Sequence, residues 1–268
     1  HDIGARRCLL YDEWPAAAAP ASASQSGNFR AWEWRGTSPS GSLDSAGNPP
    51  RRWRRSDAPP PRPLHFLHIP KTGGTSIENL GRFLGHWWGS ALYNCTGEGG
   101  CYPPKSLFSW QGVQRRCPLF HIPLDAASRA AIAAETFCVV RDPYDRFVSE
   151  YKWRTAHWRS FGCNASDMNA YLEPLLSGRS VDDCHFVAQH RFIHDEVNAA
   201  VLCDHVLPFE ALAEAVPRLL RTSRPLPHTR NVGSRCRLTA EQLNARNRRL
   251  IRTRYAEDIE LHARAVRA

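Results

Sequence analysis

A strand, a glycine loop and a helix follow one another over residues 64–84, and this string constrains the fold more than any other feature of the sequence. Residues 64–69 (LHFLHI) have the length and apolar character of a buried strand. Residues 71–74 (KTGG) form a loop, and Thr75 or Ser76 is placed to cap the helix that follows. A loop between a strand and a helix N-terminus is a place where proteins bind phosphate groups. The string therefore predicts an α/β fold with an anion site after its first strand.

Two later stretches are also predicted as strands, residues 136–140 (TFCVV) and 205–208 (HVLP). A further short strand is predicted over 119–122. The predicted helices cover residues 126–135, 144–158, 182–201, 209–221 and 239–264, the last opened by a capping box at Thr239–Gln242. Strands that alternate with helices predict a parallel, P-loop-like sheet flanked by helices.

The first 62 residues differ in composition from the rest of the chain. Ala, Ser, Gly and Pro dominate residues 1–62, and they show no hydrophobic periodicity. Such a segment buries too little apolar surface to offset chain entropy. We therefore expect a low-complexity stem or linker before a single folded domain over residues 63–268. The sequence opens with His1, so we expect a processed form whose upstream signal or anchor segment is not part of it.

The basic residues carry two further signals. The formal net charge is +9, which favours anionic ligands. Among 35 basic residues only Lys71, Lys105 and Lys152 are lysines. A lysine kept in such an arginine-rich chain suggests a role that arginine cannot fill, because lysine can give up its proton. No apolar run approaches the roughly 20 residues that a membrane span needs.

Nine cysteines without a CxxC spacing argue against a structural zinc site. Two glycosylation sequons, at Asn94 and Asn164, each lie beside a cysteine. Together these features favour an oxidising, glycosylating compartment over a cytosolic protein with free thiols.

Most cysteines are therefore expected to be oxidised, with at least one left over from the odd total. We predict the pairs Cys163–Cys184 and Cys203–Cys236, because these residues fall in loops or at helix ends. Cys138 is expected to be free, because it lies within a buried strand.

The loop at residues 71–74 is not a Walker A loop, in which the lysine follows the glycines. Here Lys71 precedes Gly73 and Gly74, and hydroxyls at Thr75 and Ser76 follow. Glycines let backbone N–H groups turn inward, and the lysine and hydroxyls complete a cage for an anion. The alternative is a tight turn in an ordinary strand–helix unit.

A second motif follows the strand at 136–140. Arg141 stands at the strand end, and Ser149 lies eight residues later, about two helical turns on. A guanidinium can grip two phosphate oxygens while the hydroxyl adds a third contact. The alternative is an ion pair between Arg141 and Asp142 at the start of a helix.

The two motifs together resemble those of a known family. Residues 68–76 (HIPKTGGTS) are similar to the 5′-phosphosulfate loop of the Golgi carbohydrate sulfotransferases, most of all the heparan sulfate 2-O- and 6-O-sulfotransferase branch. Residues 138–151 (CVVRDPYDRFVSEY) are similar to the 3′-phosphate motif of these enzymes. The resemblance covers residues 64–262, with looser matches at 206–212 and 228–234.

The resemblance implies an enzyme that takes a sulfuryl group from 3′-phosphoadenosine 5′-phosphosulfate (PAPS) without a metal. It implies a hydroxyl of a carbohydrate, glycosaminoglycan-like and acidic, as the acceptor, with no nucleic-acid partner. It also implies a type II membrane protein of the Golgi lumen, attached only through an anchor outside this sequence. The residues that the motifs assign to the donor are Lys71, Thr72, Gly73, Gly74, Thr75, Ser76, Arg141 and Ser149.

A base must remove the proton of the acceptor hydroxyl, and Lys71 suits the neutralisation of the leaving phosphate oxygen. His121 is the first candidate for the base, because residues 117–121 (CPLFH) resemble a 6-O-sulfotransferase segment in which a Cys precedes the catalytic His. His185 is the second, at a position where the family often has a His lining the acceptor groove. Glu78, in the helix after the loop, is a third. A structural role for either histidine stays open.

Three rival functions remain at this point. An ATP- or GTP-using P-loop enzyme requires a lysine after the glycines, which this chain lacks. A glycan-binding relative without activity would keep the basic groove and lack a working base. A sulfotransferase for small molecules or protein tyrosine is the third, but the sequons and cysteines favour the carbohydrate branch.

Overall fold

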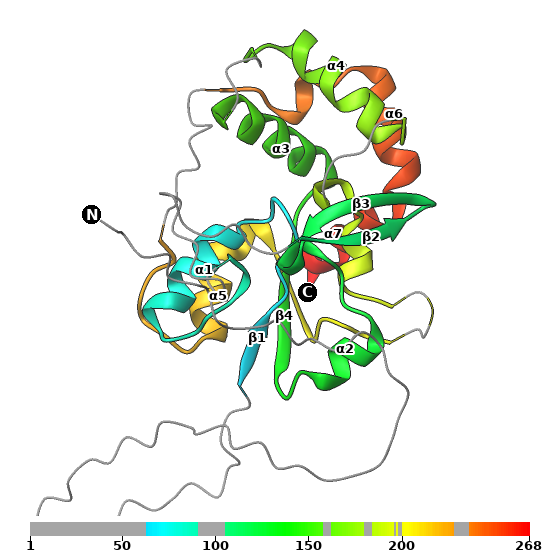
Figure 1. Cartoon of the computed structure of the whole chain (residues 1–268). Helices are drawn as coiled ribbons and strands as arrows, with labels where there is room; N and C mark the ends of the chain where they lie inside the picture. The colour runs from blue at the N-terminus through cyan, green and yellow to red at the C-terminus, as the bar shows by residue number, and fades with distance from the viewer. Residues whose placement is uncertain are drawn as a thin grey trace, which may run out of the picture. The chain divides into compact units, whose positions relative to one another are not determined.

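Three parallel strands form the central sheet of the part of the chain that the computed structural model describes, namely residues 63–90, 105–157, 162–179, 184–195, 197, 200–227 and 236–268. The sheet order is β1 (Leu64–Phe66), β4 (Glu135–Val140) and β5 (His205–Pro208) (Figure 1). The described helices are α1 (Gly74–Phe83), α2 (Ala126–Ala131), α3 (Pro143–His157), α4 (Ala165–Leu176), α5 (Leu212–Leu219), α6 (Ala245–Arg254) and α7 (Ala256–Arg267). The parallel pairing confirms the predicted α/β class.

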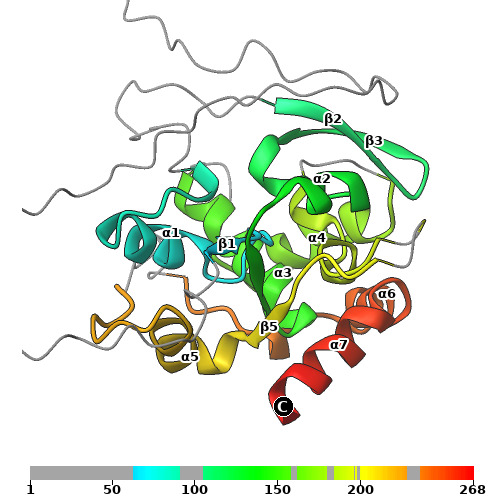
Figure 2. The same ribbon diagram turned by 90° about the horizontal axis from the view of Figure 1, so that it is seen from below.

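The middle strand, β4, separates two hydrophobic layers. Phe137 and Val139 pack in one layer with α1 and α5, while Cys138 and Val140 pack in the other. The split follows from the period-two alternation of side chains along a strand. Figures 1 and 2 both show α1 and α5 on one side of the strands and α7 on the other. Because both faces are covered, β4 is a continuous apolar run rather than an alternating one.

A hairpin lies outside the parallel sheet. Strands β2 (Lys105–Trp110) and β3 (Val113–Pro118) pair with each other and with no other described strand. Gln111 and Gly112 join them, with φ of 50° and 73°. Two left-handed residues are what a type I′ turn requires, and this turn matches the twist of a hairpin. These strands are not evident from the sequence, because Gln-Gly is a weak hairpin signal.

Two short elements differ from their predictions. The strand predicted at 119–122 is wrong, because Leu119–His121 forms a 3-10 helix. The helix predicted at 126–135 ends at Ala131, and Glu135 already pairs in β4. Asp125 caps this helix by accepting a hydrogen bond from the Ser128 N–H at 2.7 Å.

The helix predicted at 182–201 is also wrong. Two 3-10 helices, Cys184–Phe186 and Gln189–Phe192, replace it in the described part of this stretch. The buried carboxylate of Asp258 accepts the N–H of Gln189 at 2.8 Å and that of His190 at 2.9 Å. The N–H groups of this segment therefore bind a side chain of α7 instead of carbonyls of their own helix. The hydrophobic periodicity of the local sequence cannot reveal such a distant partner.

The long helix predicted at 239–264 is divided. The capping box at Thr239 and Gln242 is present, but it opens a 3-10 turn, and the chain breaks again at Tyr255 between α6 and α7. The Tyr255 hydroxyl donates to the Phe186 carbonyl at 2.8 Å, so burial of this ring fixes the break. Helix α4 is not predicted by the sequence analysis.

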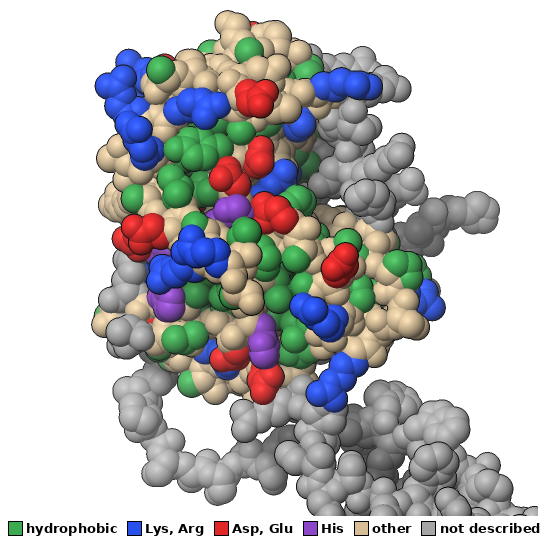
Figure 3. Space-filling model, turned by 180° about the vertical axis from the view of Figure 1, so that it is seen from behind, with side chains coloured by type: hydrophobic (Ala, Val, Ile, Leu, Met, Phe, Trp, Pro, Cys, Tyr) green, Lys and Arg blue, Asp and Glu red, His purple; other side chains and the backbone are tan. Residues whose placement is uncertain are grey.

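Charge is distributed unevenly over the surface. On the face in Figure 3, Lys and Arg side chains form several separate groups, with acidic side chains between them. The net charge of the chain therefore does not appear as one continuous basic band on this face. None of the described helices is long and apolar enough to span a membrane.

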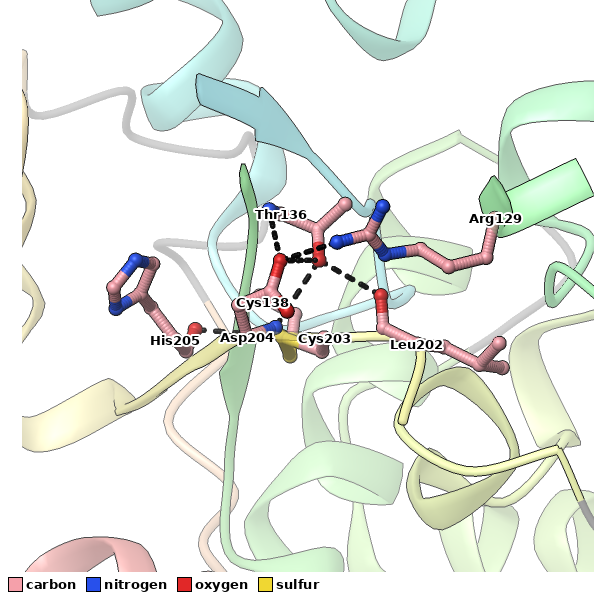
Figure 4. Close-up of a disulfide and its surroundings, with 7 residues drawn as sticks. All are labelled: Arg129, Thr136, Cys138, Leu202, Cys203, Asp204 and His205. Atoms are coloured by element: carbon pink, nitrogen blue, oxygen red, sulfur yellow. Dashed lines mark hydrogen bonds and ion pairs between the residues drawn. A yellow bond between two sulfur atoms is a disulfide. The ribbon is translucent and has the colours of Figure 1, made fainter. Parts of the chain in front are cut away.

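Three disulfides stabilise the described part of the chain, and both predicted pairs are wrong. The bonds are Cys117–Cys184, Cys138–Cys203 and Cys163–Cys236. Cys138 is not free. It lies in β4 beside β5, so it reaches the cysteine just before that strand (Figure 4). The other three cysteines, Cys8, Cys95 and Cys101, lie outside the described residues.

Beside the bond shown in Figure 4, Asp204 joins the starts of β4 and β5. Its carboxylate accepts the Thr136 N–H at 2.7 Å and the Arg129 guanidinium at 2.5 Å. The Thr136 hydroxyl donates to the Leu202 carbonyl at 2.8 Å. Side chains therefore continue the parallel pairing beyond the last backbone hydrogen bonds of the two strands.

A buried amide connects α4 to the C-terminal helices. Asn169 donates to the carbonyls of Ala165 at 2.7 Å and Gln242 at 2.9 Å. Its oxygen accepts the Asn244 N–H at 2.8 Å and the Asn247 amide at 3.0 Å. Because this one amide pairs with all these groups, its removal leaves several buried donors and acceptors without a partner.

Asn169→Ala should therefore lower the free energy of unfolding by about 2–4 kcal/mol, since each hydrogen bond contributes about 1 kcal/mol and stranded groups add to the loss. Urea unfolding measures this. Ala170→Gln, at an exposed position of the same helix, is the control and should change stability by less than about 0.5 kcal/mol. Equal effects of the two substitutions would contradict the role given to Asn169.

Candidate active site

The carboxyl ends of the three parallel strands bring the predicted motifs together. Lys71 follows β1, Arg141 follows β4 and Phe209 follows β5. The Arg141 guanidinium donates to the Lys71 carbonyl at 3.3 Å and lies over the Phe209 ring, 4.2 Å from its centroid. Residues that are 70 positions apart in the sequence thus meet at one edge of the sheet, where ligands bind in parallel α/β folds.

The loop after β1 presents a helix N-terminus. Helix α1 begins at Gly74, with Gly73 as its N-cap at φ 91°, and no side chain caps it. The prediction that Thr75 or Ser76 is the cap is therefore wrong. A Cβ on Gly74 would lie 2.1 Å from the His68 ring, so only glycine fits there. The Thr72 hydroxyl donates to the Ile69 carbonyl at 2.8 Å and is fully buried, so it holds the loop in shape.

The N-terminus of α1, which no side chain caps, and the Arg141 guanidinium, whose Nε makes no hydrogen bond within the described residues, both suit an anionic group. Arg141 is fixed through its backbone, because its N–H donates to the Gln189 side chain at 2.9 Å and its carbonyl accepts from it at 2.8 Å. The buried Nε of Arg141 has no hydrogen-bond partner among the described residues. Burial lowers the pKa of Arg141, and burial together with the Arg141 charge lowers the pKa of Lys152. Ser149 lies half-buried on the same helix as Lys152. These residues fit phosphate groups, which would relieve the crowded positive charge.

Three histidines from three separate segments form a row beside this edge. The ring centroids of His68 and His121 are 4.7 Å apart, and those of His121 and His185 are 5.0 Å apart. Both predicted base candidates are thus in contact, with His121 in the middle. His68 follows β1, while the other two lie in the 3-10 helices Leu119–His121 and Cys184–Phe186. The described part of the chain has no group of three or more His, Cys, Asp and Glu side chains arranged to hold a metal ion.

A carboxylate orients each outer histidine. His68 Nδ1 donates to Glu78, which also accepts from the Ser90 hydroxyl. Burial favours the neutral acid at Glu78, but the neighbouring His68 and the hydrogen bonds from His68 and Ser90 outweigh it and lower its pKa. His185 Nδ1 donates to Glu150 at 2.8 Å. Glu78, the third predicted base, is therefore an ionised partner of a histidine.

Glu150 belongs to this site although no sequence motif points to it. It is fully buried, accepts the Arg154 Nε–H at 2.7 Å and lies 4.0 Å from the Lys71 ammonium. Burial opposes its ionisation, but His185, Lys71 and Arg154 together lower its pKa to about 2. Trp153 lies beneath Lys71, whose ammonium is 5.0 Å from the ring centroid. Glu150 and Trp153 therefore orient the lysine, and both belong to α3, the helix that also carries Ser149.

His121 differs electrostatically from its neighbours. Its Nδ1 is buried and has no hydrogen-bond partner among the described residues. Burial lowers the pKa of His121 well below its ordinary value, and the charges of His68, His185, Lys71 and Arg146 lower it further. The imidazole is therefore neutral at pH 7 and keeps a lone pair with which to accept a proton.

Arg146 connects the segments that carry these groups. Its fully buried guanidinium donates to the Pro70 carbonyl at 3.0 Å and to the carbonyls of His185 and Val187, both at 2.9 Å. Asp258 of α7 lies 4.0 Å from the same guanidinium. The loop after β1 and the segment of His185 are thus held to one side chain of α3.

Comparison with known proteins identifies the class of enzyme. A Sulfotransferase family model matches residues 58–263, which is more than three quarters of the chain. The chain belongs to this family, whose members are PAPS-dependent transferases. No curated protein matches the chain, and no solved structure matches it.

Glu150→Gln tests the charge balance of the site. A carboxyl whose pKa falls from 4.5 to about 2 on folding adds stability that is complete above pH 4.5 and lost as the pH falls through 2. The substitution should therefore lower the free energy of unfolding by about 3 kcal/mol at pH 7 and by about half as much at pH 3. Urea unfolding at both pH values measures the difference. Glu260→Gln, on the exposed face of α7, is the control. A deficit of equal size at both pH values would contradict the depressed pKa of Glu150.

Proposed function

We propose that residues 63–268 form a catalytic domain that transfers the sulfuryl group of PAPS to a carbohydrate hydroxyl, with residues 1–62 as its stem. The observation that carries the proposal is the row of His68, His121 and His185 next to Lys71, at the sheet edge that also holds Arg141. Transfer from a phosphosulfate to a hydroxyl requires a phosphate site and a neutral base near one another, and the Lys71 charge acts on His121.

In this proposal the loop and the second motif bind the donor. The N–H groups of residues 72–75 face the 5′-phosphosulfate, while the Ser76 N–H donates to the Gly73 carbonyl at 3.0 Å. The hydroxyls of Thr75 and Ser76 lie beside this group, and Arg141 and Ser149 bind the 3′-phosphate. When bound, PAPS supplies the activated sulfuryl group. Lys71 neutralises the charge that develops on the phosphate oxygen left behind, and Glu150 holds its ammonium in place.

His121 is the proposed base. It takes the proton of the acceptor hydroxyl, because it is neutral at pH 7 and its Nδ1 has no partner among the described residues. His185 is bound to Glu150 through Nδ1, which orients its ring at the acceptor side of the row. Lys71 and the proposed base thus belong to one connected group of side chains.

The proposed acceptor and cellular location are supported by the disulfides, a glycosylation sequon and the net charge of the chain. Three disulfides and an exposed sequon at Asn164 suit the lumen of the secretory pathway, and we place the enzyme in the Golgi, where glycans are sulfated. The positive charge of the chain suits an acidic, glycosaminoglycan-like acceptor. Nucleic acid is not a proposed partner, and no metal is required.

Two measurements test the proposal in order. Thermal shift should show stabilisation by 3′,5′-adenosine bisphosphate and none by ATP with Mg²⁺. Transfer of radioactive sulfate from PAPS is then assayed over a panel of sulfated and unsulfated glycans, with tyrosine peptides and small phenols beside them. Transfer to peptides or phenols alone would overturn the carbohydrate acceptor, and donor binding without any transfer would indicate a binding module.

Lys71→Ala should reduce transfer by a factor of about 10²–10³, the loss typical for one oxyanion contact, and leave the fold intact.

Arg141→Ala should instead weaken binding of the bisphosphate by about 1.5–3 kcal/mol and reduce the preference for the 3′-phosphate. Steady-state kinetics and calorimetry separate the two effects. A Lys71→Ala enzyme with more than half of its activity would contradict the assignment of the loop.

His121→Ala should lose about 10²–10⁴ in kcat with unchanged affinity for the bisphosphate, since a base does not contact the phosphates. In the wild type, protonation of His121 should remove activity only below pH 6.5, because the pKa of this base is lowered. This acid limb should disappear from the pH–rate profile of the variant. His185→Ala should mainly raise the acceptor KM. If His185→Ala removes the acid limb and His121→Ala keeps it, the two roles are exchanged.

A further inference from the structure

One disulfide joins the two segments that carry the histidines of the proposed mechanism. Cys117 stands four residues before His121, near the end of β3, and Cys184 immediately precedes His185. Both cysteines are fully buried. The bond joins segments that are 67 residues apart in the sequence, and it does so within a few residues of the ring contact between the histidines.

Hydrogen bonds hold the two segments unequally. The His185 segment is fixed, because Arg146 binds the carbonyls of His185 and Val187. The His121 segment follows the hairpin, which pairs with no other described strand and is tied to α6 at its far turn, where the Arg254 guanidinium donates to Gln111. Its 3-10 turn is closed by its own backbone, through the Ile122 N–H and the Leu119 carbonyl at 3.1 Å. The disulfide is therefore the covalent connection from the hairpin to the Arg146-bound segment.

We propose that the Cys117–Cys184 disulfide positions His121 against His185, and that catalysis depends on it while donor binding does not. This inference rests on the proposed function, in which His121 is the base. Cys117 and Cys184 are positioning residues, since they touch neither the donor nor the acceptor.

The environment of His121 offers a readout that is independent of activity. His68 after β1, Lys71 in the loop, Arg146 on α3 and His185 are the charged or titratable groups that act on the ring. If the disulfide is lost and the ring moves away from them into water, its pKa rises toward the ordinary value. A role limited to global stability would leave this pKa unchanged in the folded variant.

The test compares two double variants of the whole chain. Cys117→Ser with Cys184→Ser removes the proposed positioning bond. Cys138→Ser with Cys203→Ser is the matched control, because its cysteines are equally buried and 65 rather than 67 residues apart. The two bonds close loops of nearly equal length, so the chain-entropy loss is nearly the same. Strands β4 and β5 remain hydrogen-bonded without the control bond.

In the first double variant we expect kcat to fall at least about tenfold, with the affinity for 3′,5′-adenosine bisphosphate within about twofold of wild type. Histidine NMR should show the pKa of His121 rising by about one unit or more. The control should keep both kcat and this pKa near wild type. Equal changes in the two variants, or an unchanged His121 pKa in the first, would overturn the proposal.

A second variant covers the case in which the first does not fold. Pro118→Gly loosens the connection between Cys117 and His121, keeps the disulfide, and removes no backbone N–H because proline has none. It should reduce kcat and raise the His121 pKa without changing bisphosphate affinity. An unchanged kcat and pKa in Pro118→Gly would contradict the proposal. If no acceptor is sulfated but the pKa shifts appear, the positioning role stands and the proposed function fails.

Discussion

The site depends on one buried cation. The guanidinium of Arg146 is fully removed from water, and such a group is strongly unfavourable unless its donors are satisfied. Three backbone carbonyls accept from its Nε and Nη2, and the Asp258 carboxylate lies 4.0 Å from its Nη1, which makes no hydrogen bond within the described residues. The same bonds fix Pro70, just before the loop of residues 71–74, relative to His185. A single electrostatic requirement therefore sets the relative positions of this loop and the His185 segment.

The sequence was sufficient for the parallel sheet, because each strand is a short apolar run next to a recognisable helix or loop signal. It was not sufficient where partners come from distant segments. The stretch after His185 looks helical locally, but Asp258 of α7 accepts the N–H groups of Gln189 and His190. The disulfide pairing failed for the same reason. Cys138 pairs because β4 lies beside β5, and that neighbourhood exists only in the folded chain.

The same contrast between local motifs and distant partners holds for the site, which the sequence predicts in part. Lys71, Arg141, His121 and His185 were chosen from motifs, and the structure brings all of them to one region. Glu150 was not chosen, although it lies one residue after Ser149. Its position in a helix gives no local sign that it is buried among cations. Its charge nevertheless has a wide effect, because it orients both Lys71 and His185.

The backbone at Lys71 has a consequence for how this loop tolerates change. Its φ of 69° lies in the left-handed region, which costs a residue with a side chain about 1–2 kcal/mol relative to glycine. Glycine at this position would therefore relax the backbone, but it would also remove the ammonium that helps to keep the buried Glu150 carboxylate ionised. At this position the backbone and the side chain favour different amino acids, and the chain carries the one that its backbone disfavours.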